Sequence, residues 1–256
     1  MSLVSLRFNA DQSRAAFTIR HPQGNIITAD MVDALRTGLD SIAANPHLKL
    51  ITVEGDGPDF SFGASIPEHA PDRIGQVLHV MHQLIEDLLE APALTAAIVR
   101  GRCLGGGFEI ALACDVIFAA DTAQLGLPEV KLGVFPPAGA ALLPARVGLA
   151  RATQAIVTGQ SRSAAEWQKT GLLELVASAE YLETAVERWF VEHLAPKSAS
   201  AIRHAAAAAR LGLLAHVRHT LPKLERLYLD DLMRTSDAVE GIAAFMERRP
   251  PKWKDA

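Results

Sequence analysis

Three consecutive glycines, Gly105-Gly106-Gly107, constrain this chain more than any other stretch of its sequence. An apolar run at 93–99 ends shortly before them, and residues 108–113 after them are typical of a helix. Glycine allows a tight turn and a close approach to a ligand, and a helix N-terminus offers unpaired N–H groups with a partial positive charge. The pattern therefore predicts an anion site where a strand becomes a helix.

Two glutamates accompany the glycines. Glu109 falls in the first turn of the expected helix, and Glu129 follows in a later turn, directly after Leu127-Pro128. Amide donors beside two carboxylates suit acid–base chemistry next to an oxyanion. Packing alone also explains glycines before a helix, and the helix dipole favours a first-turn glutamate without catalysis. No Lys-Ser or Lys-Thr follows the glycines and no dinucleotide fingerprint is complete, which argues against a nucleotide fold.

Length, composition and charge limit the classes of protein to which this chain can belong. The chain has 256 residues, of which 49% are hydrophobic and 21% charged. This length suits one principal domain, and the apolar content predicts a homo-oligomer in which partner subunits cover part of the surface. A net charge of -4 without a basic cluster gives no electrostatic reason to bind nucleic acid. The start lacks a leader pattern and no stretch is long and apolar enough to span a membrane, so we expect a cytoplasmic protein.

The cysteines and histidines predict neither disulfides nor a metal site. Cys103 and Cys114 are too few for a disulfide framework and lack zinc-ligand spacing, so we interpret both as small buried residues. The nine histidines are scattered and form no His-Glu-x-x-His motif. Metal dependence is therefore not expected.

Hydrophobic periodicity predicts strands and helices in alternation over the first two-thirds of the chain. A hairpin at 4–8 and 15–19 precedes a helix that starts at the N-cap Thr28 and stops before Asn45-Pro46. Further elements are a strand at 50–53, a long amphipathic helix at 74–90, and strands at 115–120 and 123–126. The remainder reads as helices at 137–147, 149–158, 163–169, 181–194, 199–210, 215–234 and 236–247. This order indicates an α/β or mixed layered core followed by a helical region.

A second loop combines small residues with aromatic ones. The turn-rich segment 54–59 leads into Phe60-Ser61-Phe62-Gly63-Ala64-Ser65-Ile66. Such small residues permit close approach of the backbone to a ligand, although a tight loop without a function has the same composition. Both interpretations stay open at this point.

Three motifs in order carry a family resemblance: 62–66, 105–109 and the run Leu-Gly-Leu-Pro-Glu-Val-Lys-Leu-Gly at 125–133. Together they resemble the enoyl-CoA hydratase/isomerase family, the crotonase superfamily, and the similarity runs nearly end to end. The resemblance implies an α/β fold in which a spiral of β-β-α repeats, here residues 1–195, precedes a helical C-terminal trimerisation region, here 196–256. It also implies a homotrimer or a hexamer made of two trimers.

The resemblance implies roles for particular residues as well. The backbone N–H groups of Ala64 and Gly106 would form an oxyanion hole for a thioester oxygen, and Glu109 and Glu129 would handle water and protons. The substrate or its coenzyme A part would be bound by Gly63, Ser65, Ile66, Gly105, Phe135 and Pro137. No metal and no cofactor are implied, because coenzyme A is part of the substrate.

Two departures from the common hydratase pattern affect the expected substrate. Ser65 stands where many members have Asp, and Pro-Ala-Gly-Ala-Ala-Leu-Leu-Pro at 137–144 replaces a Gly-Ala-Gly-Gly-Thr-Gln-Arg-Leu run. The segments 60–69 and 133–138 are more similar to the cyclohexa-1,5-dienecarbonyl-CoA hydratases, which implies hydration of an alicyclic dienoyl-CoA. The alternatives are a general short-chain enoyl-CoA hydratase, an enoyl-CoA isomerase that uses one glutamate, and a non-catalytic acyl-CoA-binding protein.

Overall fold

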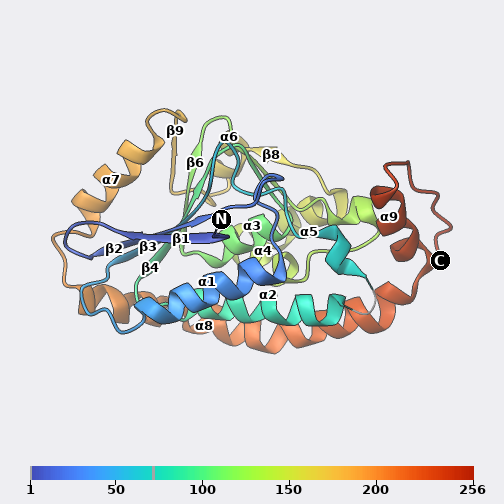
Figure 1. Ribbon diagram of the computed structural model, residues 1–256, viewed down its shortest axis with the longest axis horizontal. Helices are drawn as coiled ribbons and strands as arrows, with labels where there is room; N and C mark the ends of the chain where they lie inside the picture. The colour runs from blue at the N-terminus through green and yellow to red at the C-terminus, as the bar shows by residue number, and fades with distance from the viewer. Residues whose placement is uncertain (1, 71–72) are drawn as a thin grey trace.

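A six-stranded sheet forms the centre of the molecule. The computed structural model describes residues 2–70 and 73–256 (Figure 1). Along the sheet the strands run in the order β1 (Val4–Phe8), β2 (Arg14–Ile19), β3 (Leu50–Gly55), β4 (Leu94–Val99), β6 (Val116–Ala120) and β9 (Leu175–Ala177). β1 pairs with β2 in antiparallel fashion, as the predicted hairpin requires, and every later pairing in this sheet is parallel. Buried on both faces, the inner strands are almost continuously apolar.

A second, smaller sheet contains β5 (Arg102–Leu104), β7 (Gln124–Gly126) and β8 (Arg162–Ser163). Isolated bridges extend the same pairing, since Ile27 pairs with Ala64 and Ser61 with Cys103. Each successive unit therefore contributes one strand to the large sheet, one extended segment beside the small sheet, and one helix. This is the predicted α/β spiral of β-β-α repeats followed by helices.

The glycine turn differs in one respect from its prediction. The glycines follow β5, and not the apolar strand at 93–99, because Gly101 (φ +50°) turns the chain before β5 begins. A three-residue strand is too short to show a side-chain period, so the sequence pattern did not reveal it.

Nine helical ranges in the described parts of the chain surround the sheets: α1 (Ala29–Ile42), α2 (Ile74–Leu89), α3 (Gly106–Ala113), α4 (Pro137–Val147), α5 (Leu149–Thr158), α6 (Ala164–Gln168), α7 (Leu182–His193), α8 (Ala199–Arg226) and α9 (Ser236–Met246). Local signals place several of their ends. The Oγ1 of Thr28 accepts a hydrogen bond from the N–H of Met31, 3.2 Å away, at the start of α1. Pro137 is the first residue of α4, where its missing N–H costs nothing.

One helical prediction is wrong. No break separates the predicted ranges 199–210 and 215–234: α8 is one 28-residue helix that continues through Gly212 to Arg226, followed by a π-helical turn, η3 (Leu227–Asp231), and a 3₁₀ turn, η4 (Leu232–Arg234). A glycine inside a helix costs only about 1 kcal/mol relative to alanine. Packing of α8 against α2, α4 and β4 offsets that cost. Figure 1 shows α8 running along one side of the molecule beside α2.

A buried ion pair joins α8 to the strands. Arg210 is 4% exposed, and its Nε donates to Asp115 Oδ1 at 2.7 Å while its other nitrogens donate to the carbonyls of Ala91 and Ala93, each at 2.7 Å. The helical region thus packs on the core of its own chain. A boundary between residues 195 and 196 stays a prediction. None of the described helices is both long and apolar enough to cross a membrane.

Candidate active site

Two loops meet beside the small sheet and bring the predicted amide donors together. The N–H of Ser61 donates to the carbonyl of Arg102, and the N–H of Leu104 donates to the carbonyl of Ser61, both at 3.0 Å. Gly63 (φ +108°) and Gly105 (φ +49°) follow in backbone conformations that favour glycine. The loop at 60–66 is therefore held against β5 and the start of α3.

A Cβ added to either glycine of this junction would contact the facing segment, and Gly63 also has a positive φ. A Cβ on Gly63 would lie 3.1 Å from the carbonyl oxygen of Leu104, and one on Gly106 would lie 3.4 Å from the backbone nitrogen of Ala64. Gly106 begins α3, so its N–H has no acceptor within the helix. Across residues 2–70 and 73–256, no protein oxygen accepts a hydrogen bond from the N–H of Ala64 or of Gly106. Two unpaired amide donors therefore lie close together.

Glu109 lies on the first turn of α3 and is buried, with 6% exposure. Its Oε1 accepts a 2.8 Å hydrogen bond from the N–H of Gly139 in the first turns of α4. Burial raises the pKa of Glu109, while the Gly139 N–H and the nearby imidazole of His82 oppose that rise. The start of α4 therefore positions this carboxylate.

Glu129 begins the 3₁₀ turn η2 (Glu129–Leu132), directly after Pro128. Its Oε1 faces Gly105, because a Cβ on that glycine would lie 2.7 Å from it. Its Oε2 is buried and has no hydrogen-bond partner among the residues that the structure describes. Burial raises the pKa of Glu129 well above its ordinary value, and the charge of Glu109 raises it further. The two carboxyl groups thus share one site and favour a state in which one of them keeps a proton.

The other predicted binding residues lie around this centre. Ser65 is buried, and its N–H donates to the carbonyl of Ile27 at 2.9 Å, while Ile66 begins the 3₁₀ turn η1 (Ile66–His69). Within the described ranges, no hydrogen bond joins the Ser65 hydroxyl to either glutamate, and Ile66 offers only an apolar side chain. Pro137 is buried at the start of α4, and Phe135 packs edge-on against Tyr228 with 5.4 Å between ring centroids.

Sequence reasoning missed three residues beside the glutamates. Gly139 binds Glu109, His82 lies on the buried side of α2 near Glu109, and Tyr228 packs beside Phe135. A glycine two residues after Pro137 was a weak signal for a close approach at α4. No local pattern distinguishes His82 or Tyr228 from other residues of an amphipathic helix.

The cysteines behave as predicted, and no metal cluster is found. Cys103 and Cys114 are fully buried and unpaired; burial raises the pKa of both thiols, that of Cys114 to about 12. Both are therefore poor nucleophiles. In the described part of the chain, no three His, Cys, Asp or Glu side chains are grouped as metal ligands would be. That metal is dispensable stays a prediction.

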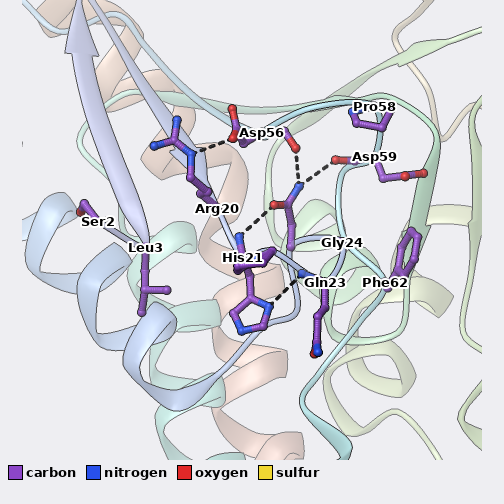
Figure 2. A pocket seen from close by; sticks show the side chains of 12 residues that line it. Ser2, Leu3, Arg20, His21, Gln23, Gly24, Asp56, Pro58, Asp59 and Phe62 are labelled. Carbon is purple, nitrogen blue, oxygen red and sulfur yellow. Dashed lines mark hydrogen bonds and ion pairs between the residues drawn. The ribbon is translucent and has the colours of Figure 1, made fainter.

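A surface hollow of about 820 Å³ lies beside the loop at 60–66 and includes Phe62 in its lining (Figure 2). Its charged groups bond to one another: Arg20 Nε donates to Asp56 Oδ2 at 2.7 Å. The Nδ2 of Asn25 donates to the carbonyls of Asp56 and Asp59, each at 2.9 Å. Neither Glu109 nor Glu129 lines the hollow, so the predicted acid–base groups lie outside it.

Comparison with known proteins identifies the class. The sequence profile of the enoyl-CoA hydratase/isomerase family matches residues 9–256, and the chain belongs to this family. It is 42% identical over 245 residues to the cyclohexa-1,5-dienecarbonyl-CoA hydratase of Thauera aromatica, covering 96% of this chain and 94% of that protein. It is 33% identical to a probable enoyl-CoA hydratase of Bacillus subtilis (strain 168), covering 99% of each. The crystal structure of an enoyl-CoA hydratase from Mycobacterium avium subsp. paratuberculosis K-10 superposes with a TM-score of 0.87 at 28% identity, covering 99% of each chain.

These similarities confirm the predicted crotonase-type fold and the predicted family. They also confirm the expected enzyme class at the level of the family, a hydro-lyase of the enoyl-CoA hydratase type. The roles of individual site residues stay predictions.

Proposed function

We propose that this protein adds water to a conjugated enoyl- or dienoyl-CoA thioester. The observation that carries the proposal is the pairing of two backbone N–H groups that have no acceptor in the described chain with two glutamates, the buried Glu109 and the half-buried Glu129, whose Oε2 is buried. Preorganised backbone N–H groups stabilise negative charge that develops on an oxygen during the reaction, and carboxylates transfer protons. Coenzyme A enters as part of the substrate, and the reaction needs no further cofactor.

In this mechanism the thioester carbonyl oxygen accepts hydrogen bonds from the N–H groups of Ala64 and Gly106. Polarisation of the carbonyl makes the conjugated alkene electrophilic, and negative charge builds on the oxygen as water attacks. One glutamate removes a proton from the attacking water while the other delivers a proton to carbon, so that H and OH add across the double bond. The raised pKa values of Glu109 and Glu129 favour the singly protonated pair that this exchange requires.

For the acyl group we propose an alicyclic ring, as in cyclohexa-1,5-diene-1-carbonyl-CoA. The higher identity to the Thauera aromatica hydratase, 42% against 33% for the Bacillus subtilis protein, supports this substrate. So does the segment at the start of α4, where Pro136 and Pro137 are buried and Phe135 presents an aromatic ring. A flat ring gains roughly 25 cal/mol per Å² of apolar area that it buries against such a surface.

Specificity constants for purified substrates test this function. A cyclic dienoyl-CoA, a cyclic monoenoyl-CoA and crotonyl-CoA are offered separately, and kcat/KM for hydration is compared. We expect the cyclic dienoyl-CoA to rank first. A crotonyl-CoA value equal or higher would support a general short-chain hydratase, double-bond migration without hydration an isomerase, and binding without turnover a non-catalytic acyl-CoA-binding protein.

The proposal includes a homotrimer or a dimer of trimers in the cytoplasm. The 49% hydrophobic composition supports subunit association, and apolar side chains such as Leu149, Leu211 and Phe245 are more than half exposed in the single chain. Light scattering on the purified protein measures the assembly, and a monomer would contradict it.

A further inference from the structure

Tyr228 is a buried polar residue that the proposed mechanism does not use. Its side chain is 1% exposed, and its hydroxyl is buried without a hydrogen-bond partner among the residues that the structure describes. A buried hydroxyl without a partner is costly and therefore uncommon in a folded protein. A hydroxyl retained at such a site indicates a partner that the protein itself does not supply.

The position of Tyr228 is set by a local irregularity of the backbone. The residue lies in η3, the π-helical turn that continues α8, and such turns occur frequently at functional sites. One turn earlier, Glu225 accepts a 2.6 Å hydrogen bond from the buried imidazole of His82 on α2. This contact fixes the end of α8 just before Tyr228.

Neighbours of Tyr228 join it to the backbone of Glu129. Its ring packs edge-on against Phe135, 5.4 Å away, and belongs to the same buried apolar cluster as Val134. The N–H of Val134 donates to the carbonyl of Glu129 at 3.3 Å. Burial raises the pKa of the Tyr228 hydroxyl, and the nearby carboxylates of Glu129 and then Glu109 raise it further, so the phenol keeps its proton at neutral pH.

Two buried polar atoms in this part of the described chain lack partners, and the charge of Glu129 acts on the Tyr228 hydroxyl. The Oε2 of Glu129 is an acceptor without a donor, and the hydroxyl of Tyr228 is a donor without an acceptor. One water molecule bound between them would satisfy both, since water donates to a carboxylate and accepts from a phenol. In the reverse reaction, the hydroxyl of the hydrated product can likewise donate to the Glu129 carboxylate and accept from the Tyr228 phenol.

We propose that Tyr228 is a third polar residue of the active site and holds the reacting water, or the product hydroxyl, against Glu129. This inference rests on the proposed hydration. It adds a hydrogen-bond donor and changes no bond that forms or breaks in the reaction. Because the contact is to the added oxygen and not to the acyl chain, its effect is the same for cyclic and linear substrates.

The test compares Tyr228→Phe with Tyr181→Phe, a control that removes the hydroxyl of the chain's other tyrosine, which is 61% exposed. We expect Tyr228→Phe to lower kcat by about 10–100-fold, the cost of one lost hydrogen bond to a charged or reacting group, and to leave KM nearly unchanged on the best substrate. Its Tm should stay close to that of the wild type, because the hydroxyl has no protein partner to lose and an ordered water contributes little to stability. Tyr181→Phe should match the wild type in every measurement. In a double-mutant cycle, Tyr228→Phe should cost less in the Glu129→Gln background, since both groups bind one water.

A structure-based measurement decides the inference independently of turnover. A high-resolution crystal structure of the free protein should show a water within hydrogen-bond distance of both the Tyr228 hydroxyl and Glu129 Oε2, and Tyr228→Phe should lose that water. Unchanged kcat in a stable Tyr228→Phe protein, or no such water in the crystal, overturns the inference while the proposed hydration stands. Lack of hydration of every thioester by the wild type overturns the proposed function instead, and the crystal structure still tests the water site.

Discussion

Replacing Gly105 by alanine tests the geometry of the glutamate pair more directly than removing a carboxylate. Gly105 has φ +49°, and an added Cβ would lie 2.7 Å from Oε1 of Glu129. An ordinary contact starts at 3.4 Å, so the carboxyl group has to move by the difference, about 0.7 Å. The substitution thus displaces Glu129 and keeps its charge.

Two separate costs follow from this geometry. A non-glycine residue in such a backbone conformation costs about 1–3 kcal/mol, which lowers Tm by roughly 2–12 °C for a chain of this size. A misplacement of about 1 Å in a catalytic site costs on the order of 100-fold in rate. We therefore expect kcat of Gly105→Ala to fall by about 10–100-fold in addition to the loss of stability.

Gly148→Ala is the matched control, because Gly148 also has a positive φ, +82°, but a Cβ there meets nothing within 4 Å. Both variants are compared by thermal melting and by steady-state hydration of the best substrate well below Tm. We expect similar losses of Tm and a loss of kcat only in Gly105→Ala. Equal activity of the two variants would show that the position of the Glu129 carboxylate does not limit the reaction.

Three further predictions concern charge. Glu109→Gln and Glu129→Gln should each lower kcat by roughly 10²–10⁴-fold with the fold intact, and a variant within a few-fold of wild type would exclude that residue as acid or base. Burial and the charge of Glu109 raise the pKa of Glu129 in the folded state, so the wild type should lose stability as pH rises above about 4.3, the ordinary glutamate value. The Tm of Glu129→Gln minus that of the wild type should therefore increase with pH. A difference that does not change with pH would contradict this expectation. Arg210→Met leaves Asp115 without its buried partner and should lower the free energy of unfolding by about 3–5 kcal/mol, or Tm by roughly 6–20 °C. Arg218→Met is the control: this arginine is 47% exposed, and its loss should lower the free energy of unfolding by at most about 1 kcal/mol.

Short-range features of this fold were readable from the sequence. The hairpin, the Thr28 cap and the start of α4 at Pro137 depend on residues within a few positions of each other, and so their signals survive in the linear order. The same holds for the glycine turn with Glu109 after it. Sequence alone, however, left open whether that turn binds a ligand or only packs, and the family resemblance was needed to choose.

Tertiary structure decided the contacts that complete the site. The approach of Gly106 to Ala64 joins segments about forty residues apart in the chain, and the bond from Gly139 to Glu109 joins two helices. The continuation of α8 through Gly212 to Tyr228 depends on packing against α2 and α4. Whether a polar atom is buried, paired or left without a partner is a property of all the segments that surround it, and therefore no local pattern records it.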